Sequence, residues 1–120
     1  MSKTKISRRF TFEAAHFLPD HPGKCKNLHG HRWELIVEIA GMLQNGMVMD
    51  YADLKKIVEE NVIDQFDHKV LNEVVHFIPT SELLANHIVN MLIGPFMNQG
   101  VYIQKIILKE TENSFCEVIP

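Results

Sequence analysis

The chain begins with two stretches in which apolar and polar residues alternate, which is the pattern of strands with one buried face. The first covers residues 4–18, and one parity of its side chains includes Phe12 and His16. The second covers residues 29–39, and its apolar parity starts with two histidines and continues through Trp33. Proline and glycine residues interrupt the chain between the stretches. We therefore expect an antiparallel hairpin with an irregular loop.

A helical pattern follows the hairpin. Asp50 stands where it can cap a helix, and an apolar stripe with helical spacing continues to about Ile63. Residues 64–79 lack such a stripe and are expected to be non-helical. Thr80 or Ser81 then caps a second helix, which a Gly-Pro pair ends.

Two more strands are predicted near the C-terminus. Residues 101–111 are rich in β-branched side chains, and residues 115–119 form a short partner. The order ββααββ defines an α+β domain with one four-stranded antiparallel sheet and two helices on one face. The uncovered face must meet water or another subunit, and the sheet edges favour extension across an oligomer.

Length and composition limit the class of protein. The 120 residues contain no repeat or linker, so residues 1–120 form a single domain. The net charge of −3 and the lack of a basic stripe argue against nucleic acid as the main partner. No apolar stretch approaches the ~20 residues of a membrane span, and the N-terminus lacks the apolar core of a signal peptide. We expect a cytoplasmic protein with free thiols.

Three histidines, His16, His29 and His31, fall on the apolar parity of the two predicted strands. The hairpin would bring them together, with Cys25 on the loop beside them. A single histidine there would usually be a core residue bonded to the backbone, but three that converge favour a metal site. Neutral imidazoles suit Zn²⁺, and three protein nitrogens leave the fourth tetrahedral position free for water or substrate. An open zinc site points to catalysis.

Two acidic residues, Asp67 and Glu110, are further candidates for a functional role. Asp67 and His68 adjoin in the segment expected to be non-helical, where an acid–base pair and a surface loop pair are equally open interpretations. Glu110 shares its parity with Ile106 and Leu108, so it projects from a partly apolar face. A carboxylate in such a place needs partners, although a solvated residue at a strand end is the alternative.

Five motifs occur in order along nearly the whole chain. They are F-T-F-E-A-A-H at 10–16, C-x-x-x-H-G-H at 25–31, D-H-x-x-L-N at 67–72, P-T-S-E at 79–82 and K-E-T at 109–111. With these motifs the chain resembles the 6-pyruvoyl-tetrahydropterin synthase family. The resemblance implies a tunnelling fold (T-fold), in which three subunits join their sheets into a barrel and two trimers stack into a homohexamer.

The resemblance also implies roles for residues. The implied zinc ligands are His16, His29 and His31. The implied catalytic residues are Cys25, Asp67 and His68, and the Asp-His pair is expected to reach the site across a subunit boundary. Glu110 is expected to anchor the pterin by accepting from its ring N–H and 2-amino group. Thr80 and Ser81 remain divided between helix capping and pterin contact.

The spacing between Cys25 and His29 bears on the reaction. Three residues separate them, which resembles the carboxy-forming members of the family rather than the pyruvoyl-forming animal enzymes. This implies a lyase that converts 7,8-dihydroneopterin triphosphate to 6-carboxy-5,6,7,8-tetrahydropterin, with release of acetaldehyde and triphosphate, in queuosine and 7-deazapurine biosynthesis. The alternatives are triphosphate elimination to 6-pyruvoyl-tetrahydropterin and a non-catalytic zinc-binding oligomeric module.

Overall fold

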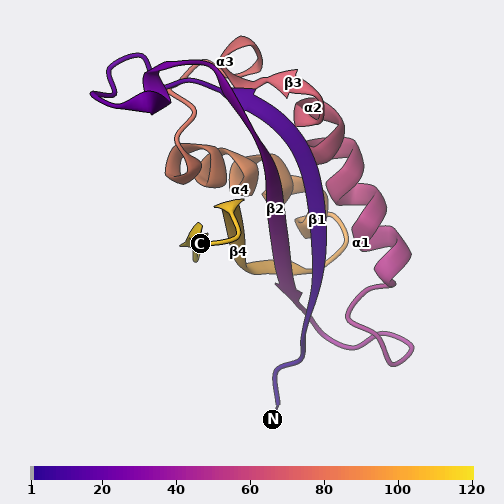
Figure 1. Ribbon diagram of the computed structural model, residues 1–120. Coiled ribbons are helices and arrows are strands. Elements are labelled where there is room, and N and C mark those ends of the chain that lie inside the picture. The colour runs from indigo at the N-terminus through magenta and orange to yellow at the C-terminus, as the bar shows by residue number, and fades with distance from the viewer. Residues whose placement is uncertain (1) are drawn as a thin grey trace.

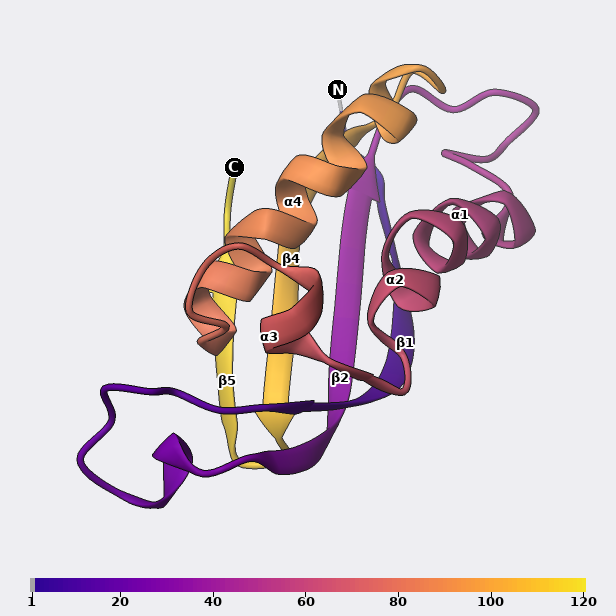
Figure 2. The same cartoon turned by 90° about the horizontal axis from the view of Figure 1, so that it is seen from above.

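The computed structural model describes residues 2–120 (Figure 1). Its strands form one twisted sheet in the order β3-β1-β2-β4-β5. The α-helices cover the same face of this sheet (Figure 2). The strands are β1 Lys5–His16, β2 His29–Ala40, β3 Lys69–Val70, β4 Tyr102–Thr111 and β5 Ser114–Val118. The predicted α+β class, with helices on one face, is confirmed.

The hairpin of β1 and β2 is the longest feature of the sheet. Its antiparallel pairing runs from Lys5 opposite Ala40 to His16 opposite His29, so the alternation predicted for both strands is present. Trp33 is fully buried on the helix-facing side, and its indole N–H donates to the Ala14 carbonyl oxygen at 3.2 Å. This bond ties the two strands together next to the histidines.

The sheet has a fifth strand that the sequence did not predict. β3 is only two residues long and pairs in parallel with β1 at Ala14 and Ala15. The short helices α2 (Asp64–Phe66) and α3 (Leu71–Val74) flank it, so residues 64–79 are not wholly non-helical. These elements form because Phe66 and Leu71 bury their side chains in the core and hold the segment against β1. None of them is long enough to show a period in the sequence.

The first predicted helix is present, with an irregular end. α1 spans Tyr51–Val58, and the Asp50 carboxylate caps it by accepting from the Ala52 N–H at 2.8 Å. A π-helical turn, η2 (Glu59–Ile63), then leads into α2. The predicted limit at Ile63 therefore marks the end of the π turn.

The second predicted helix continues further than expected. α4 spans Ser81–Met97 and is capped by Thr80, whose Oγ1 accepts from the Leu83 N–H at 3.1 Å. The prediction that it ends at the Gly-Pro pair was wrong, because Pro95 lies inside the helix. Proline removes a single N–H there, and the fully buried Phe96 keeps the last turn packed on the core.

The core lies between the sheet and the helices, and the opposite sheet face is charged. On that face Glu34 pairs with Arg9 and with Lys109, each at 3.2 Å. Within residues 2–120, no helix is both long and apolar enough to cross a membrane. The largest fully buried side chains are Trp33, Phe12, Phe66, Phe96, Leu35, Ile39, Leu54, Leu71, Leu84, Ile88, Leu92 and Ile106.

Candidate metal centre

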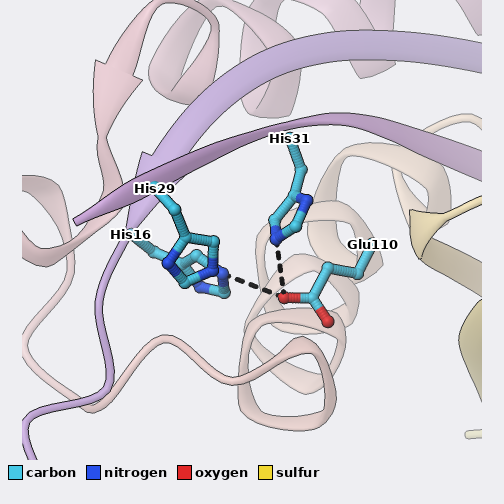
Figure 3. Close-up of side chains that lie close together, drawn as sticks. All are labelled: His16, His29, His31 and Glu110. Carbon is cyan, nitrogen blue, oxygen red and sulfur yellow. Dashed lines mark ion pairs between the residues drawn. The ribbon is translucent and has the colours of Figure 1, made fainter. Parts of the chain in front are cut away.

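Three imidazoles lie together where the β1–β2 hairpin meets its loop (Figure 3). His16 is paired with His29, and His31 is paired with Ala14 two residues earlier on β1. The ring centroids of His16 lie 4.6 Å from His29 and 5.4 Å from His31. The two-residue period of a strand thus places all three rings on the helix-facing side. Their role as ligands remains a prediction.

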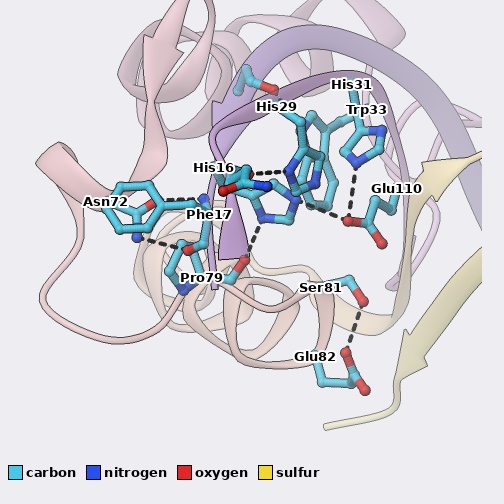
Figure 4. A network of polar contacts seen from close by, with 12 residues as sticks. His16, Phe17, His29, His31, Trp33, Asn72, Pro79, Ser81, Glu82 and Glu110 are labelled. Atoms are coloured by element: carbon cyan, nitrogen blue, oxygen red, sulfur yellow. Dashed lines mark hydrogen bonds and ion pairs between the residues drawn. The ribbon is translucent and has the colours of Figure 1, made fainter. Parts of the chain in front are cut away.

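Backbone carbonyl groups orient two of these rings. Nδ1 of His16 lies 2.8 Å from the Pro79 carbonyl oxygen (Figure 4). Nδ1 of His29 lies 2.7 Å from the Asn27 carbonyl oxygen. Because a carbonyl oxygen can only accept, each Nδ1 carries a proton, and in the neutral ring Nε2 then has a free lone pair. This tautomer is the one that histidine ligands adopt when a neighbouring carbonyl positions them for a metal.

Glu110 completes the cluster from the end of β4. Its Oε1 lies 2.9 Å from His16 Nε2 and 3.2 Å from His31 Nε2. The pairing of β4 with β5 is irregular between Lys109 and Thr111, so Glu110 stands at a local break in the ladder. Such irregularities turn side chains toward active sites.

The donor set fits a bound metal ion. His16 Nε2 is fully buried and makes no hydrogen bond, although the Glu110 oxygen is close by. A lone pair and a carboxylate oxygen at this distance repel each other unless a cation or proton lies between them. The donor atoms of the three histidines and Glu110 all lie within 4.8 Å of one another. Imidazole nitrogens with one carboxylate oxygen form a typical zinc ligand set.

The charge state of His31 favours metal binding. Burial of its imidazole lowers its pKa below the ordinary value of 6.5, against the opposing attraction of Glu110, and the two neighbouring histidines lower it further. The ring is therefore neutral at pH 7, which is the state that binds a metal.

The side chains of Asp67 and His68 contact each other at the outer edge of β1. Asp67 Oδ2 lies 3.0 Å from His68 Nδ1, while Asp67 Oδ1 accepts from the Glu13 N–H at 2.9 Å. The Glu13 hydrogen bond is the largest of the causes that hold the pKa of the Asp67 carboxyl below its ordinary 3.8. The His68 side chain is 79% exposed. The structure thus brings the predicted pair together, but the pair is not part of the group of four metal donors.

Cys25 lies in the loop after β1, in the 3-10 turn η1 (Lys24–Lys26). Its thiol is free and half-buried, and its carbonyl oxygen accepts from the Leu18 N–H at 2.7 Å. The loop projects beyond the sheet (Figure 2).

Of the two residues at the start of α4, Thr80 is the cap, and Ser81 donates to Glu82 Oε1 at 2.8 Å. Pterin contact by Thr80 and Ser81 remains a prediction.

Two groups that support the cluster received no role from the sequence. One is the Pro79 carbonyl group, which fixes His16. The other is Asn72, whose side chain hydrogen-bonds the backbone of Phe17 (Figure 4). Asn72 stands in the D-H-x-x-L-N motif, which was its only signal, whereas nothing in a sequence marks one carbonyl group among many.

The sheet, its helical cover and the histidine centre define a T-fold protein. The chain belongs to the 6-pyruvoyl tetrahydropterin synthase family, whose sequence model matches residues 5–120. It is 37% identical to the 6-carboxy-5,6,7,8-tetrahydropterin synthase of Haemophilus influenzae over a 139-residue alignment, which covers 94% of this chain and 96% of that relative. It is also 36% identical to the 6-pyruvoyl tetrahydrobiopterin synthase of Pongo abelii over 130 residues, covering 93% and 88%.

A solved structure agrees with these sequence relatives. The 6-pyruvoyl tetrahydropterin synthase of Caenorhabditis elegans superimposes with a TM-score of 0.86 at 28% identity, over 100% of this chain and 97% of that one. The predicted family, the predicted T-fold and the prediction that the chain is an enzyme are confirmed.

Proposed function

We propose that this protein is a zinc-dependent carbon–carbon lyase of queuosine and 7-deazapurine biosynthesis that acts in the cytoplasm. It converts 7,8-dihydroneopterin triphosphate to 6-carboxy-5,6,7,8-tetrahydropterin and releases acetaldehyde and triphosphate. The observation that carries the proposal is the buried Nε2 of His16, which has no hydrogen bond and faces further metal donors. The Haemophilus influenzae relative that bears the name of this synthase supports the choice of reaction.

His16, His29 and His31 would hold the zinc ion. When bound, zinc would supply Lewis-acid polarisation of the oxygens on the substrate side chain. The chain's own contribution begins with orientation, because the Pro79 and Asn27 carbonyl groups keep the protons of His16 and His29 on Nδ1. Both Nε2 atoms are thus ready to bind before the metal arrives.

Two groups of the chain would move protons. The Cys25 thiolate would accept a proton from the substrate side chain. His68 would carry the second proton. Its Nδ1 lies 3.0 Å from Asp67 Oδ2, which would keep a proton on Nδ1 and leave Nε2 free to accept one. Asp67 is ionised at neutral pH, since its ordinary pKa of 3.8 is already far below 7 and the hydrogen bond from the Glu13 N–H lowers it further.

The position of the Asp67–His68 pair supports a shared site. The pair sits beside β3, at one outer edge of the sheet, and outside the histidine–glutamate donor group. We propose that it serves the metal centre of a neighbouring subunit. The assembly would be a homohexamer of two stacked trimers, in which the edge strands β3 and β5 join sheets into a barrel.

Glu110 would anchor the pterin ring, with Thr80 and Ser81 near it at the start of α4. An ionised carboxylate accepts from two adjacent N–H donors in bidentate fashion, which matches the ring N–H and 2-amino group of a pterin. Glu110 projects toward the histidines and is partly exposed, so its second oxygen remains accessible (Figure 3).

A pyruvoyl-forming activity is the second candidate, because the Pongo abelii relative is nearly as similar as the carboxy-forming one. The short spacing between Cys25 and His29 favours the carboxy-forming reaction. A non-catalytic zinc-binding oligomer is the third candidate, and the presence of Cys25 with the Asp67–His68 pair argues against it.

One incubation separates these candidates. The zinc-loaded protein is mixed with 7,8-dihydroneopterin triphosphate, acetaldehyde is measured with a coupled alcohol dehydrogenase, and the pterin products are identified by mass spectrometry. We expect one acetaldehyde per 6-carboxy-5,6,7,8-tetrahydropterin. A pyruvoyl product without acetaldehyde would establish the second candidate. No product from a zinc-replete protein would favour the non-catalytic module.

A further inference from the structure

Glu110 lies close enough to two histidines to bind the same metal ion, in addition to its proposed role as the pterin anchor. Its Oε1 is 2.9 Å from His16 Nε2 and 3.2 Å from His31 Nε2. In a tetrahedral zinc site with bonds of about 2.1 Å, neighbouring donor atoms are about 3.4 Å apart. The oxygen therefore stands near the distance of a fourth ligand, in the position that a catalytic site keeps open for water or substrate.

The second oxygen of Glu110 is not engaged in the same way. Both contacts use Oε1, and Figure 3 shows Oε2 pointing away from the rings. The side chain is 26% exposed, so the carboxylate lies at the boundary between the histidine cluster and solvent. One carboxylate is thus within reach of a metal and of a ligand that arrives from outside.

The backbone around Glu110 permits rotation of the side chain without loss of the strand. The pairing of β4 with β2 reaches Lys109, and the pairing of β4 with β5 resumes at Thr111. Lys109 is anchored by its Nζ on Glu34 Oε2 at 3.2 Å, and Thr111 Oγ1 accepts from the Asn113 N–H at 3.2 Å. Glu110 stands between two fixed neighbours and is itself at the irregularity.

We propose that Glu110 is the fourth metal ligand while no pterin is bound, and that the pterin draws it off the metal. The inference rests on the proposed function for the identity of the ligand. The two adjacent N–H donors of the pterin offer the carboxylate a bidentate partner. The carboxylate exchanges its bond to the metal for these two hydrogen bonds and stays ionised throughout, so no proton is transferred. The coordination position then opens only when a heterocycle of the correct shape is present, and other oxygen ligands are excluded from the idle metal.

The test uses the protein loaded with Co²⁺, whose absorption bands report its ligands, and azide as a probe for an open position. Three proteins are compared: wild type, Glu110→Gln and the control Glu112→Gln, which changes an exposed carboxylate in the turn after β4. If Glu110 occupies the position at least nine-tenths of the time, azide binds wild type about tenfold or more weakly than Glu110→Gln. Glu112→Gln should behave as wild type. Glu110→Asp keeps the charge but shortens the reach, so it should resemble Glu110→Gln.

Unsubstituted pterin is then added, since it carries both donors but no side chain that could reach the metal. We expect it to raise the azide affinity of wild type about tenfold and to leave that of Glu110→Gln unchanged. Equal spectra and azide affinities for wild type and Glu110→Gln would overturn the fourth-ligand assignment. Pterin binding is followed separately by its own fluorescence. Bound pterin with an unchanged azide affinity would overturn the displacement, whereas failure of wild type to bind pterin counts against the proposed function instead.

Discussion

The side-chain amide of Asn72 makes two hydrogen bonds to the backbone of Phe17. Nδ2 donates to the Phe17 carbonyl oxygen at 2.9 Å, and Oδ1 accepts from the Phe17 N–H at 2.9 Å. β1 ends one residue earlier, at His16, and β3 pairs with β1 only as far as Ala15. Asn72 thus continues the backbone pairing past His16. The Pro79 carbonyl group contacts the His16 ring at Nδ1, and we expect Asn72 to assist in positioning this ring by fixing the backbone of the next residue.

Replacement of Asn72 by alanine should weaken both the fold and the metal centre. The Phe17 N–H and carbonyl group would lose their partners, which lowers the free energy of unfolding by about 1–3 kcal/mol. Loss of a contact that orients a ligand lowers metal affinity by about 10-fold or more. Zinc affinity is measured by competition with a chelator.

The matched control is Asn61→Ala. Asn61 is similarly half-buried and donates from Nδ2 to the Ile57 carbonyl oxygen at 2.8 Å, within the helical segment. It should lose stability and keep its zinc affinity. Equal zinc affinities for the two variants would show that Asn72 does not position His16.

Replacement of His29 by alanine should remove most of the bound zinc. Trp33 offers a direct readout, because it is the single tryptophan of the chain and its ring centroid lies 5.1 Å from His16 and 5.9 Å from His31. Zinc should change the Trp33 emission of wild type and of the control His76→Ala, whose side chain is exposed, but not that of His29→Ala. Full zinc content in His29→Ala, measured by metal analysis, would contradict the ligand assignment.

The long strands could be predicted from the sequence and the short ones could not. The alternation in β1 and β2 repeats over 12 residues each, which is enough to define a buried face. β3 has two residues and no period, and it is held by contacts far along the chain, such as the hydrogen bond from the Glu13 N–H to Asp67. Such contacts exist only once the fold has formed.

The candidate site was also predictable only in part. Strand parity was sufficient to bring the three histidines to one face, and it also predicted the face of Glu110. Parity could not predict the contact of Glu110 with His16, because the irregularity between Lys109 and Thr111 decides where the end of β4 points. The contact of the Pro79 carbonyl group with His16 could not be predicted either, since every residue carries a carbonyl group.

Replacement of Cys25 by alanine should leave zinc and pterin binding intact while turnover falls. General acid–base groups contribute about 10²–10⁴-fold, so a loss in that range is expected. Cys116→Ala is the control, because burial raises the pKa of the Cys116 thiol and its Sγ donates to the Ser81 carbonyl oxygen at 3.5 Å. Turnover of Cys25→Ala near that of Cys116→Ala would show that the base lies elsewhere.

Zinc occupancy should fall as the pH drops below the range of neutral histidine. A ligand imidazole must lose its proton, and the unperturbed pKa is about 6.5. Burial lowers the pKa of His31, so the unfolded chain takes up this proton more readily than the folded one. The stability of the metal-free protein therefore decreases as the pH falls through about 6.5. Chelator competition and urea unfolding between pH 5 and about 8 test both trends, and occupancy that is constant into strong acid would contradict the first.

Replacement of Asp67 by asparagine should abolish the proton transfer by His68 without affecting zinc. The amide oxygen can still accept from the Glu13 N–H, but an NH₂ donor then faces His68 Nδ1, where the carboxylate oxygen lay at 3.0 Å. A donor there favours the tautomer with the proton on Nε2, so His68 can no longer accept a proton at that atom. Turnover should fall about 10²-fold or more at unchanged zinc content, as expected for loss of a general acid–base group.

The pH dependence of Asp67→Asn supplies a second readout. The pKa of Asp67 is lowered in the folded protein, so its contribution to stability is present above the ordinary 3.8 and is lost as the pH falls through the lower folded value. Asp67→Asn should therefore be less stable than wild type at pH 7, and the difference should shrink in acid. Asp64→Asn, which changes an exposed carboxylate in α2, should alter neither turnover nor zinc content. If the two variants had the same turnover, the Asp67–His68 pair would have no part in the reaction, because Asp67 and not Asp64 is the carboxylate that is paired with His68.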